Sequence, residues 1–278
     1  MAKNHNKNKI TTLVAKDQVL EKTDSLDTMI GSGEFGSVWS LSDPNEVLKV
    51  SFLKTKSDKD SFDREIYYLK LLNTKCPGLT PKLKKKVLSS DNKVGYQVME
   101  RFESSMKDLG LQQSAAKELC KGSRFYSWSH VEQALGLATK LDRLGIVHGD
   151  AKLANILYRM LGPRMHMVWS DFGFSGCNTV FSPLNGFTTN YGSSSSVFFE
   201  NGKAKLFKPI PEAILPYFNR LQIYTDLLQG RTTYVETKTS KKNIQKLDEK
   251  IRFLLQIPQS VYQEMGHYCK EFKVPVSK

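Results

Sequence analysis

The sequence predicts an α+β fold with two lobes, a small lobe rich in β-strands and a larger, mainly helical one. The first observation is that short strand-like segments, with one amphipathic helix among them, fill the chain as far as Phe102. The second is that the pattern becomes helical after Phe102. The expected parts are a basic N-terminal tail over residues 1–22, the small lobe over residues 23–101 and the larger lobe over residues 102–278.

Glycine, turn-forming and β-branched residues mark the first strands. Residues 1–22 are polar and basic, so they carry at most a weak lead-in strand. Residues 30–40 are punctuated by glycine, an Asp-Pro-Asn turn follows at 43–45, and a β-branched run follows at 47–50. This order predicts a pair of strands followed by a third.

One helix and two further strands complete the small lobe. Phe62, Ile66 and Leu69 recur at the spacing of one helix face, which predicts a helix there. The segment around Val87 and residues 95–100 then supply two strands.

The larger lobe opens with a capped helix. Ser129 and Glu132 match a capping box, and Gly145 is placed to end the helix. Its apolar face is predicted to consist of Val131, Leu135, Ala138 and Leu141.

The composition excludes several classes of protein. The chain carries 41 Lys and Arg against 28 Asp and Glu, a net charge of +13, and its 40% hydrophobic content is too high for a disordered chain. No apolar run approaches the roughly 20 residues of a membrane span, and the N-terminus lacks the apolar segment of a secretory signal. Four cysteines without metal-type spacing argue against a zinc site or a disulfide scaffold and favour a reducing, intracellular compartment.

Two basic runs, at residues 82–86 and 238–246, stand out in the charge pattern. A positive surface attracts nucleic acid, phosphate-rich membranes or acidic proteins. The favoured interpretation of the runs is a solvated strand edge or helix face. A weak contact with DNA or with an acidic protein is the alternative.

Residues 31–38 match the pattern G-x-G-x-x-G-x-V. Without Cβ atoms, glycines let backbone N–H groups approach phosphate oxygens. A glycine-rich hairpin with no ligand gives the same pattern, so the motif alone is a weak signal. A dinucleotide-binding βαβ unit is disfavoured, because a strand and not a helix is predicted after the third glycine.

Lys49 and Glu65 form a second candidate group. Lys49 lies in a predicted strand, and Glu65 lies on the helix that follows it. A strand Lys held by a helix Glu presents its ammonium group to the α- and β-phosphates of a nucleotide. Either residue alone is more often a solvated surface charge, so their order along the chain carries the prediction.

Residues 148–155 fit the pattern H-x-D-x-K-x-x-N, directly after the capped helix. Phosphoryl transfer to a hydroxyl needs a carboxylate that orients the hydroxyl and accepts its proton, which suits Asp150. Asn155 offers an oxygen to Mg²⁺, and Lys152 offers a cation to the transferred phosphate. Asp171 begins an Asp-Phe-Gly sequence behind a predicted strand and would complete the metal site, because Mg²⁺ prefers oxygen ligands.

In this order the motifs resemble those of the eukaryotic-type Ser/Thr protein kinases, over roughly residues 30–230. The resemblance implies a bilobal kinase fold, ATP with Mg²⁺ or Mn²⁺ as cofactors, and C-terminal helices reduced to residues 242–256 and 259–272. It implies that Asp150, Lys152, Lys49 and Glu65 are catalytic, that Asn155 and Asp171 bind the metal, and that His148 braces the catalytic loop. It further implies nucleotide contacts from Ile30, Gly31, Ser32, Gly33, Glu34, Phe35, Gly36, Val38 and Lys49, with Met99 as gatekeeper and the backbone of Glu100 and Phe102 facing adenine.

The activation segment that the resemblance implies is assigned by counting, because Ala-Pro-Glu is missing. If residues 192–200 correspond to the family's Gly-Thr to Glu stretch, Ser193 contacts the catalytic loop. Thr189 then lies at the usual phosphosite, and Glu212 takes the place of a structural Asp.

Gly149 departs from the family, whose members usually carry an Arg before the catalytic Asp. That Arg grips a phosphate in the activation segment, so its absence predicts activity that does not need phosphorylation of Thr189. His-Gly-Asp also occurs in aminoglycoside- and choline-type small-molecule kinases, which are the first alternative. A pseudokinase scaffold is the second, although no catalytic motif is lost.

The sequence of residues 148–158, the total length and the short chain end are similar to the baculoviral protein kinase family of large DNA viruses. This finer resemblance implies a Ser/Thr protein substrate, a basic DNA-condensing viral protein in particular. It also implies the host nucleus or the virion as the setting. The oligomeric state is open, a homodimer included.

Overall fold

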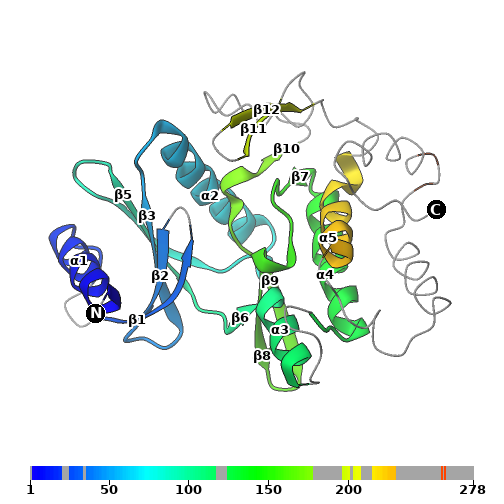
Figure 1. Cartoon of the computed structure of the whole chain (residues 1–278), viewed down its shortest axis with the longest axis horizontal. Helices are drawn as coiled ribbons and strands as arrows, with labels where there is room; N and C mark the ends of the chain where they lie inside the picture. The colour runs from blue at the N-terminus through cyan, green and yellow to red at the C-terminus, as the bar shows by residue number, and fades with distance from the viewer. Residues whose placement is uncertain are drawn as a thin grey trace. The chain divides into compact units, whose positions relative to one another are not determined.

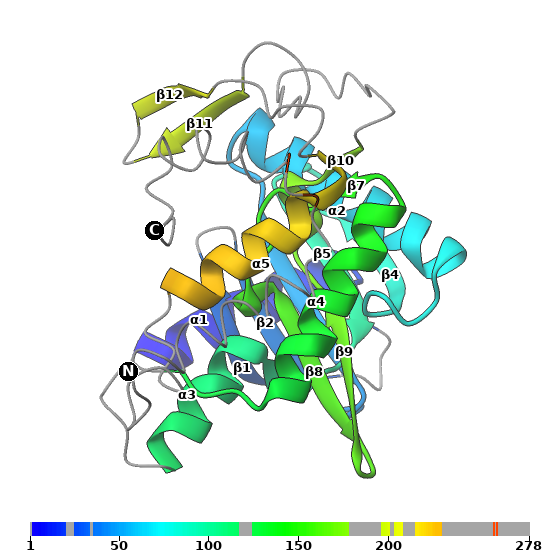
Figure 2. The same ribbon diagram turned by 90° about the vertical axis from the view of Figure 1, so that its right-hand side faces the viewer.

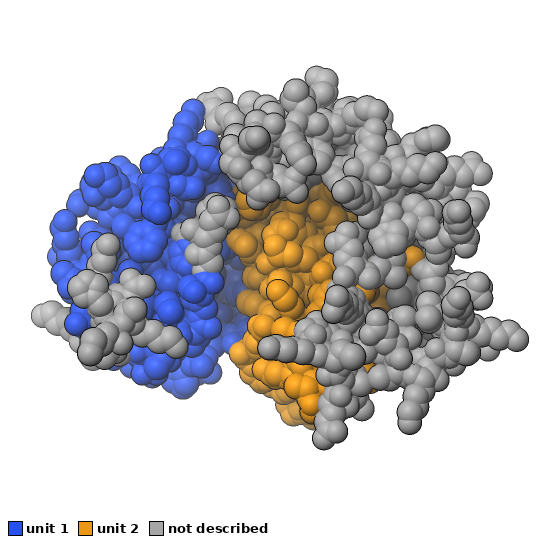
Figure 3. Space-filling model, in the orientation of Figure 1, with its two compact units in different colours: residues 1–102 blue, residues 103–278 orange. Residues whose placement is uncertain are grey.

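The computed structural model divides the chain into two units, residues 1–102 and residues 103–278, both of mixed α and β structure (Figure 3). The sequence placed this division after residue 101. The residues that the structure describes are 2–20, 25–33, 36–116, 124–177, 196–200, 203–207 and 215–229, with the single positions 258 and 260.

The first unit is built on a five-stranded antiparallel sheet with the strand order β1-β2-β3-β5-β4 (Figure 1). β5 is central in this order, because it pairs with β3 along one side and with β4 along the other. The strands are β1 (Leu26–Gly33), β2 (Gly36–Leu41), β3 (Glu46–Phe52), β4 (Leu83–Leu88) and β5 (Val94–Glu100).

The helix α2 (Lys56–Lys75) follows β3, as the apolar spacing predicted. Thr55 caps it, accepting a hydrogen bond from the backbone of Asp58, whose side chain accepts one from Thr55 in return. Phe62 and Ile66 are buried with Leu53 against one face of the sheet. The helix is therefore held both by its capping box and by its apolar face.

A second helix, α1 (Ala2–Lys16), occupies the segment that the sequence suggested as a tail or weak strand. Ile10 and Val14 on this helix are buried, and the Tyr96 hydroxyl donates to Asp17 at 2.6 Å. Burial raises the pKa of Tyr96, so its hydroxyl stays protonated as a donor. The apolar cluster under α1 consists of Val19, Leu26, Trp39, Leu41, Leu48, Val50, Val94, Tyr96 and Val98.

The sheet therefore lies between two helices. Because side chains alternate along a strand, Tyr96 and Val98 of β5 belong to the cluster that contains α1. Gly95 and Gln97 face α2 instead, since Gly95 abuts the Phe62 ring and Gln97 bonds a side chain of that helix. A polar side chain at an odd-numbered residue in the middle of β5, such as Gln97, consequently faces α2.

The second unit combines a three-stranded antiparallel sheet, β6-β8-β9, with the helices α3, α4 and α5. Figure 2 shows α4 and α5 side by side. Two short strand pairs, β7 with β10 and β11 with β12, complete its described part. The helices are α3 (Met106–Ala116), α4 (Trp128–Arg143) and α5 (Phe218–Gln229), and the strands are β6 (Ser104–Ser105), β7 (Ile146–Val147), β8 (Ile156–Leu161), β9 (Arg164–Trp169), β10 (Gly176–Cys177), β11 (Ser196–Glu200) and β12 (Lys203–Phe207).

The cap of α4 differs from the predicted one. Ser127, and not Ser129, is the N-cap, and its partner in the capping box is His130 in place of Glu132. The predicted apolar face is nevertheless the buried one, and the backbone at Gly145 has φ 66° beyond the last turn. Only Ser129-x-x-Glu132 matches the usual pattern with Glu or Gln at the third helical position, so the His130 partner could not be recognised from that pattern.

Several expectations fall on other parts of the chain. Thr189, Ser193 and Glu212 lie outside the described residues, as do the basic run at 238–246 and both late helices apart from the single position 260. Residues 196–200, expected as part of the activation segment, form β11, which pairs with β12. No helix among the described residues is both long and apolar enough to cross a membrane.

Candidate active site

The glycine-rich segment is a β-hairpin in the first unit. Gly31 pairs with Val38, and Gly33 pairs with Gly36, so a strand follows the third glycine as predicted. A side chain at Gly36 would collide with the carbonyl oxygen of Val50 on β3, which explains why glycine is required there. Ile30 and Ser32 are exposed. Glu34 and Phe35 lie outside the described residues.

Lys49 and Glu65 meet inside the first unit. The Lys49 Nζ lies 2.8 Å from both carboxylate oxygens of Glu65, although the two residues are 16 positions apart. The Glu65 side chain is only 6% exposed and that of Lys49 is 20% exposed, so the carboxylate is the more buried partner. Removing one charged partner of a pair with this shielding would leave the other charge uncompensated.

Three residues expected near adenine lie at the end of β5. Met99 is buried and pairs with Val47 of β3, and Phe102 is buried as well. The N–H of Glu100 donates to the carbonyl oxygen of Lys82, which commits that N–H within the sheet. Glu100 therefore cannot offer its amide hydrogen to a ligand while β4 is paired.

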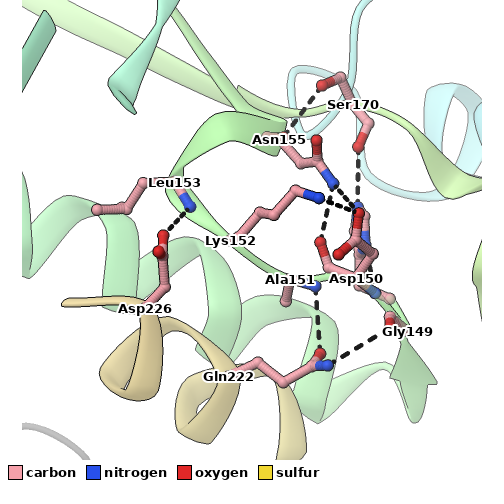
Figure 4. Close-up of polar contacts among 10 residues, drawn as sticks. Gly149, Asp150, Ala151, Lys152, Leu153, Asn155, Ser170, Gln222 and Asp226 are labelled. Carbon is pink, nitrogen blue, oxygen red and sulfur yellow. Dashed lines mark hydrogen bonds and ion pairs between the residues drawn. The ribbon is translucent and has the colours of Figure 1, made fainter. Parts of the chain in front are cut away.

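A polar cluster in the second unit surrounds Asp150 (Figure 4). Its Oδ2 lies 2.7 Å from the Lys152 Nζ and accepts a hydrogen bond from the Asn155 Nδ2 at 2.9 Å. The same Asn155 nitrogen donates to the backbone carbonyl of Asp150, also at 2.9 Å. One carboxylate thus receives a cation and an amide, and these two contacts fix its orientation.

His148 lies at the base of this loop and is fully buried between the rings of Trp169 and Phe172. The Asp150 N–H donates to Nδ1, so the proton of the neutral ring is on Nε2, which donates to the Ser170 carbonyl at 2.9 Å. Burial lowers the pKa of His148 and keeps the ring uncharged. His148 therefore links the loop at 148–155 to the segment before Asp171.

Gly149 has a backbone conformation that an arginine would adopt only with strain. Its φ is +83°, and a Cβ at this position would collide with the carbonyl oxygen of Phe174. The missing arginine of the resemblance is thus accompanied by a backbone that excludes a side chain.

The metal ligands expected from sequence, Asn155 and Asp171, lie at neighbouring ends of β8 and β9. Ile156 pairs with Trp169, and the N–H of Ser170 donates to the Asn155 carbonyl at 2.9 Å, which brings the two ends together. Among the described residues no hydrogen bond reaches the Asn155 Oδ1, so this oxygen remains for a cation. Asp171 has the left-handed φ of 63°, a conformation that is uncommon outside glycine.

These two oxygen donors fit Mg²⁺ better than they fit a metal held by protein alone. Within the described residues there is no cluster of three His, Cys, Asp or Glu side chains that could hold a metal. Mg²⁺ commonly takes one or two protein oxygens and completes its coordination with phosphate and water. An amide oxygen of Asn155 and a carboxylate of Asp171 are therefore ligands of the kind that Mg²⁺ accepts.

The helix α5 holds the loop at 148–155 in place, which sequence reasoning missed. Asn219 accepts from the His148 N–H at 2.8 Å. Gln222 accepts from the Ala151 N–H at 3.2 Å, and Asp226 accepts from the Leu153 N–H at 2.7 Å (Figure 4). Polar residues at i, i+3 and i+7 of an otherwise apolar helix were the available signal. The sequence placed only Glu212 at the position of a structural Asp, and Glu212 lies outside the described residues.

Comparisons with known proteins add no relative to this picture. No protein-family model matches the chain. No curated protein matches it either.

Proposed function

We propose that this chain is a protein serine/threonine kinase that transfers the γ-phosphate of ATP, with Mg²⁺, to protein hydroxyls. The observation that carries the proposal is the arrangement around Asp150, where an ammonium group and an amide share one carboxylate. A carboxylate oriented in this way suits a residue that positions a hydroxyl and takes its proton. ATP would supply the phosphoryl group, and the bound Mg²⁺ would supply positive charge that offsets the negative charge of the phosphates.

Each residue of the loop has a separate task in this proposal. Asp150 orients the acceptor hydroxyl and accepts its proton on the carboxylate. Lys152, beside it, stabilises negative charge on the transferred group, and Asn155 and Asp171 hold the metal. Positioning and electrostatics account for most of the rate in phosphoryl transfer, so rigid support of the loop by α5 and His148 belongs to the catalytic arrangement.

The first unit supports the proposal independently. A lysine on a strand, paired with a glutamate on the following helix, suits contact with the α- and β-phosphates. The hairpin over residues 31–38 supplies backbone N–H groups in a glycine-rich turn. Two separate parts of the chain thus carry groups that suit one nucleotide.

The acceptor is proposed to be a protein, and a basic DNA-condensing protein in a host nucleus or virion is the most specific form of the proposal. The His-Gly-Asp sequence keeps small-molecule acceptors as the competing candidate, since Gly149 belongs to that pattern as well. A pseudokinase scaffold would bind partners without turnover. These acceptors can be separated directly by assay.

The test measures phosphate transfer from γ-labelled ATP to a mixture of nuclear and virion proteins, with aminoglycosides and choline as parallel acceptors. We expect label on serine and threonine, with activity reduced about 10²–10⁴-fold in Asp150→Asn. Asp91→Asn removes an exposed carboxylate in a turn and serves as the matched control, with unchanged activity. Label only on small molecules, or none on any acceptor, would refute the proposal.

A further inference from the structure

Gln97 occupies a position on β5 directly opposite Lys49 of β3. Paired residues of neighbouring strands project to the same face of a sheet, so both side chains face α2. Gln97 is 0% exposed. A long polar side chain at the centre of a sheet needs a reason, because an apolar residue would fill the space without desolvating an amide.

The Gln97 amide is bonded to Glu65. Its Nε2 donates to the Glu65 Oε2 at 3.1 Å, and the same oxygen accepts from the Lys49 Nζ at 2.8 Å. The opposite amide orientation would set an oxygen against a carboxylate oxygen, so the network fixes the nitrogen toward Glu65. Lys49, Glu65 and Gln97 therefore form one connected group, the Glu65 triad.

The oxygen of the Gln97 amide receives no hydrogen bond from the described residues. This atom, Oε1, is buried. A buried acceptor of this kind lowers stability relative to an apolar side chain of similar size. The position therefore carries a cost in stability, and the hydrogen bond to Glu65 is what it gains in return.

We propose that Gln97 is a positioning residue for nucleotide binding: it holds the Glu65 carboxylate in place while Lys49 shares its ammonium group with phosphate. Lys49 has three N–H donors, and phosphate oxygens compete with Glu65 for them. The hydrogen bond that the Gln97 amide donates to Glu65 does not depend on Lys49. The Glu65 carboxylate therefore keeps its orientation while phosphate competes for the lysine. This inference rests on the proposed function and adds a residue to it.

The main test compares Gln97→Met with the unchanged protein. Removing the amide is expected to raise the KM for ATP, and the Kd for ATP with Mg²⁺ measured by calorimetry, at least about fivefold, as for a lost bond to a charged group. The KM for the protein acceptor should stay unchanged. The thermal midpoint should stay equal or rise, because a buried acceptor without a partner is gone.

A merely structural role predicts the opposite pair of results. A lower thermal midpoint with an unchanged KM for ATP would overturn the inference. Ser114→Ala is the matched control, because Ser114 on α3 is another buried side chain whose oxygen has no partner within the described residues. This variant should change neither kinetic constant.

A second variant, Gln97→Glu, tests the geometry through pH. Two carboxyl groups at this separation cannot both ionise easily, so one proton is shared between them at low pH and mimics the amide N–H. We expect a KM for ATP near that of the unchanged protein at about pH 6, rising at least about tenfold by about pH 8.5 as the proton leaves. A pH profile that overlays the original would overturn the inference. If the protein without substitutions transfers no phosphate from ATP, both the proposed function and this inference are refuted. If that protein is active and Gln97→Met leaves the KM for ATP unchanged, only the inference is refuted.

Discussion

Gly149 illustrates how a single residue constrains this site. Its positive φ and the nearby Phe174 carbonyl together exclude any side chain, although the preceding and following residues, His148 and Asp150, both carry essential bonds. Within the proposed function, no side chain at position 149 can therefore bind a phosphate of the activation segment. The prediction that activity is independent of phosphorylation at Thr189 thus gains a backbone reason within the proposed function.

Substitution of this glycine should be far more costly than substitution of a matched one. Gly149→Ala combines a left-handed backbone with a collision, whereas Gly162→Ala has φ +60° and open space around it. We expect Gly162→Ala to lower the free energy of unfolding by about 1–2 kcal/mol and Gly149→Ala to lower it by more than about 4 kcal/mol. Urea unfolding measures both, and equal losses would contradict the steric argument.

His148 makes a prediction about acid stability. Burial lowers its pKa, so the unfolded chain binds a proton near the ordinary value of 6.5 while the folded chain does not. Stability is therefore retained above about pH 6.5 and lost as the pH falls below it, with a slope of up to about 1.4 kcal/mol per pH unit. His148→Gln should remove that share of the slope in unfolding measured between pH 7 and 5. His130, whose pKa burial also lowers, is present in both proteins and cancels in the difference. Identical slopes would contradict a buried neutral ring.

At the scale of elements, α5 is the support of the loop at 148–155. It is itself anchored to α4, because Asp142 accepts from the Arg220 Nε at 2.7 Å and from the Asn219 side chain at 2.9 Å. Burial raises the pKa of Asp142, while Arg220 and Asn219 act against that shift. The anchor is buried on both sides, with side chains 8% and 1% exposed for Arg220 and Asp142.

Breaking this anchor should be more harmful than replacing it. Arg220→Met leaves a buried carboxylate without its cation and should lower the free energy of unfolding by about 3–5 kcal/mol. Adding Asp142→Leu to it removes the uncompensated charge and should recover part of the loss. A double-mutant cycle by chemical unfolding measures the coupling, and purely additive losses would refute it.

The elements differ in how well the sequence predicted them. The five strands and α2 carry local signals, namely turns, β-branched runs and an apolar face, and these elements formed where they were expected. The helix α1 has a weak pattern, with Ile10, Leu13 and Val14 as its large apolar residues, and it is stabilised by the sheet face that it covers. The bonds from Asn219, Gln222 and Asp226 join segments more than 70 positions apart, which no local pattern reveals.

The whole molecule carries a net charge of +13, and two of the four lysines in its basic run at 82–86 are paired with carboxylates within the chain. Lys84 is paired with Glu46, Lys86 is paired with Asp63 at 3.1 Å, and Lys85 donates to the Val19 carbonyl. β4 is also an edge strand, where lysines discourage pairing with other chains. The favoured interpretation, a solvated strand edge, is the one that these contacts support.

Binding to duplex DNA should therefore reflect overall charge and not this run. We expect weak binding in which the affinity falls at least about tenfold between 50 and 200 mM salt. Lys84→Ala combined with Lys86→Ala should leave the salt slope unchanged, because both lysines already have partners. Fluorescence anisotropy measures the slope, and either a marked decrease in that variant or no binding at low salt would contradict the prediction.

The candidate site could be predicted from sequence in its chemistry but not in its support. The sequence pattern predicted that Asp150, Lys152 and Asn155 lie near one another, because they are close along the chain. The order of Lys49 and Glu65 along the chain predicted that these two residues pair. Gln97 gave no signal, because a single polar residue in a buried strand matches no motif. Its role depends on which helix lies over that face of the sheet.

The burial of α1 affects the order of events during synthesis. The helix α1 leaves the ribosome before the sheet that it covers, because Tyr96 of β5 is 79 positions further along the chain than its partner Asp17. At the roughly 5–20 residues added per second in cells, the helix waits roughly 4–16 s for that strand. During this interval Ile10 and Val14 have no completed surface to cover, so a fusion partner or chaperone at the N-terminus meets them before the sheet does.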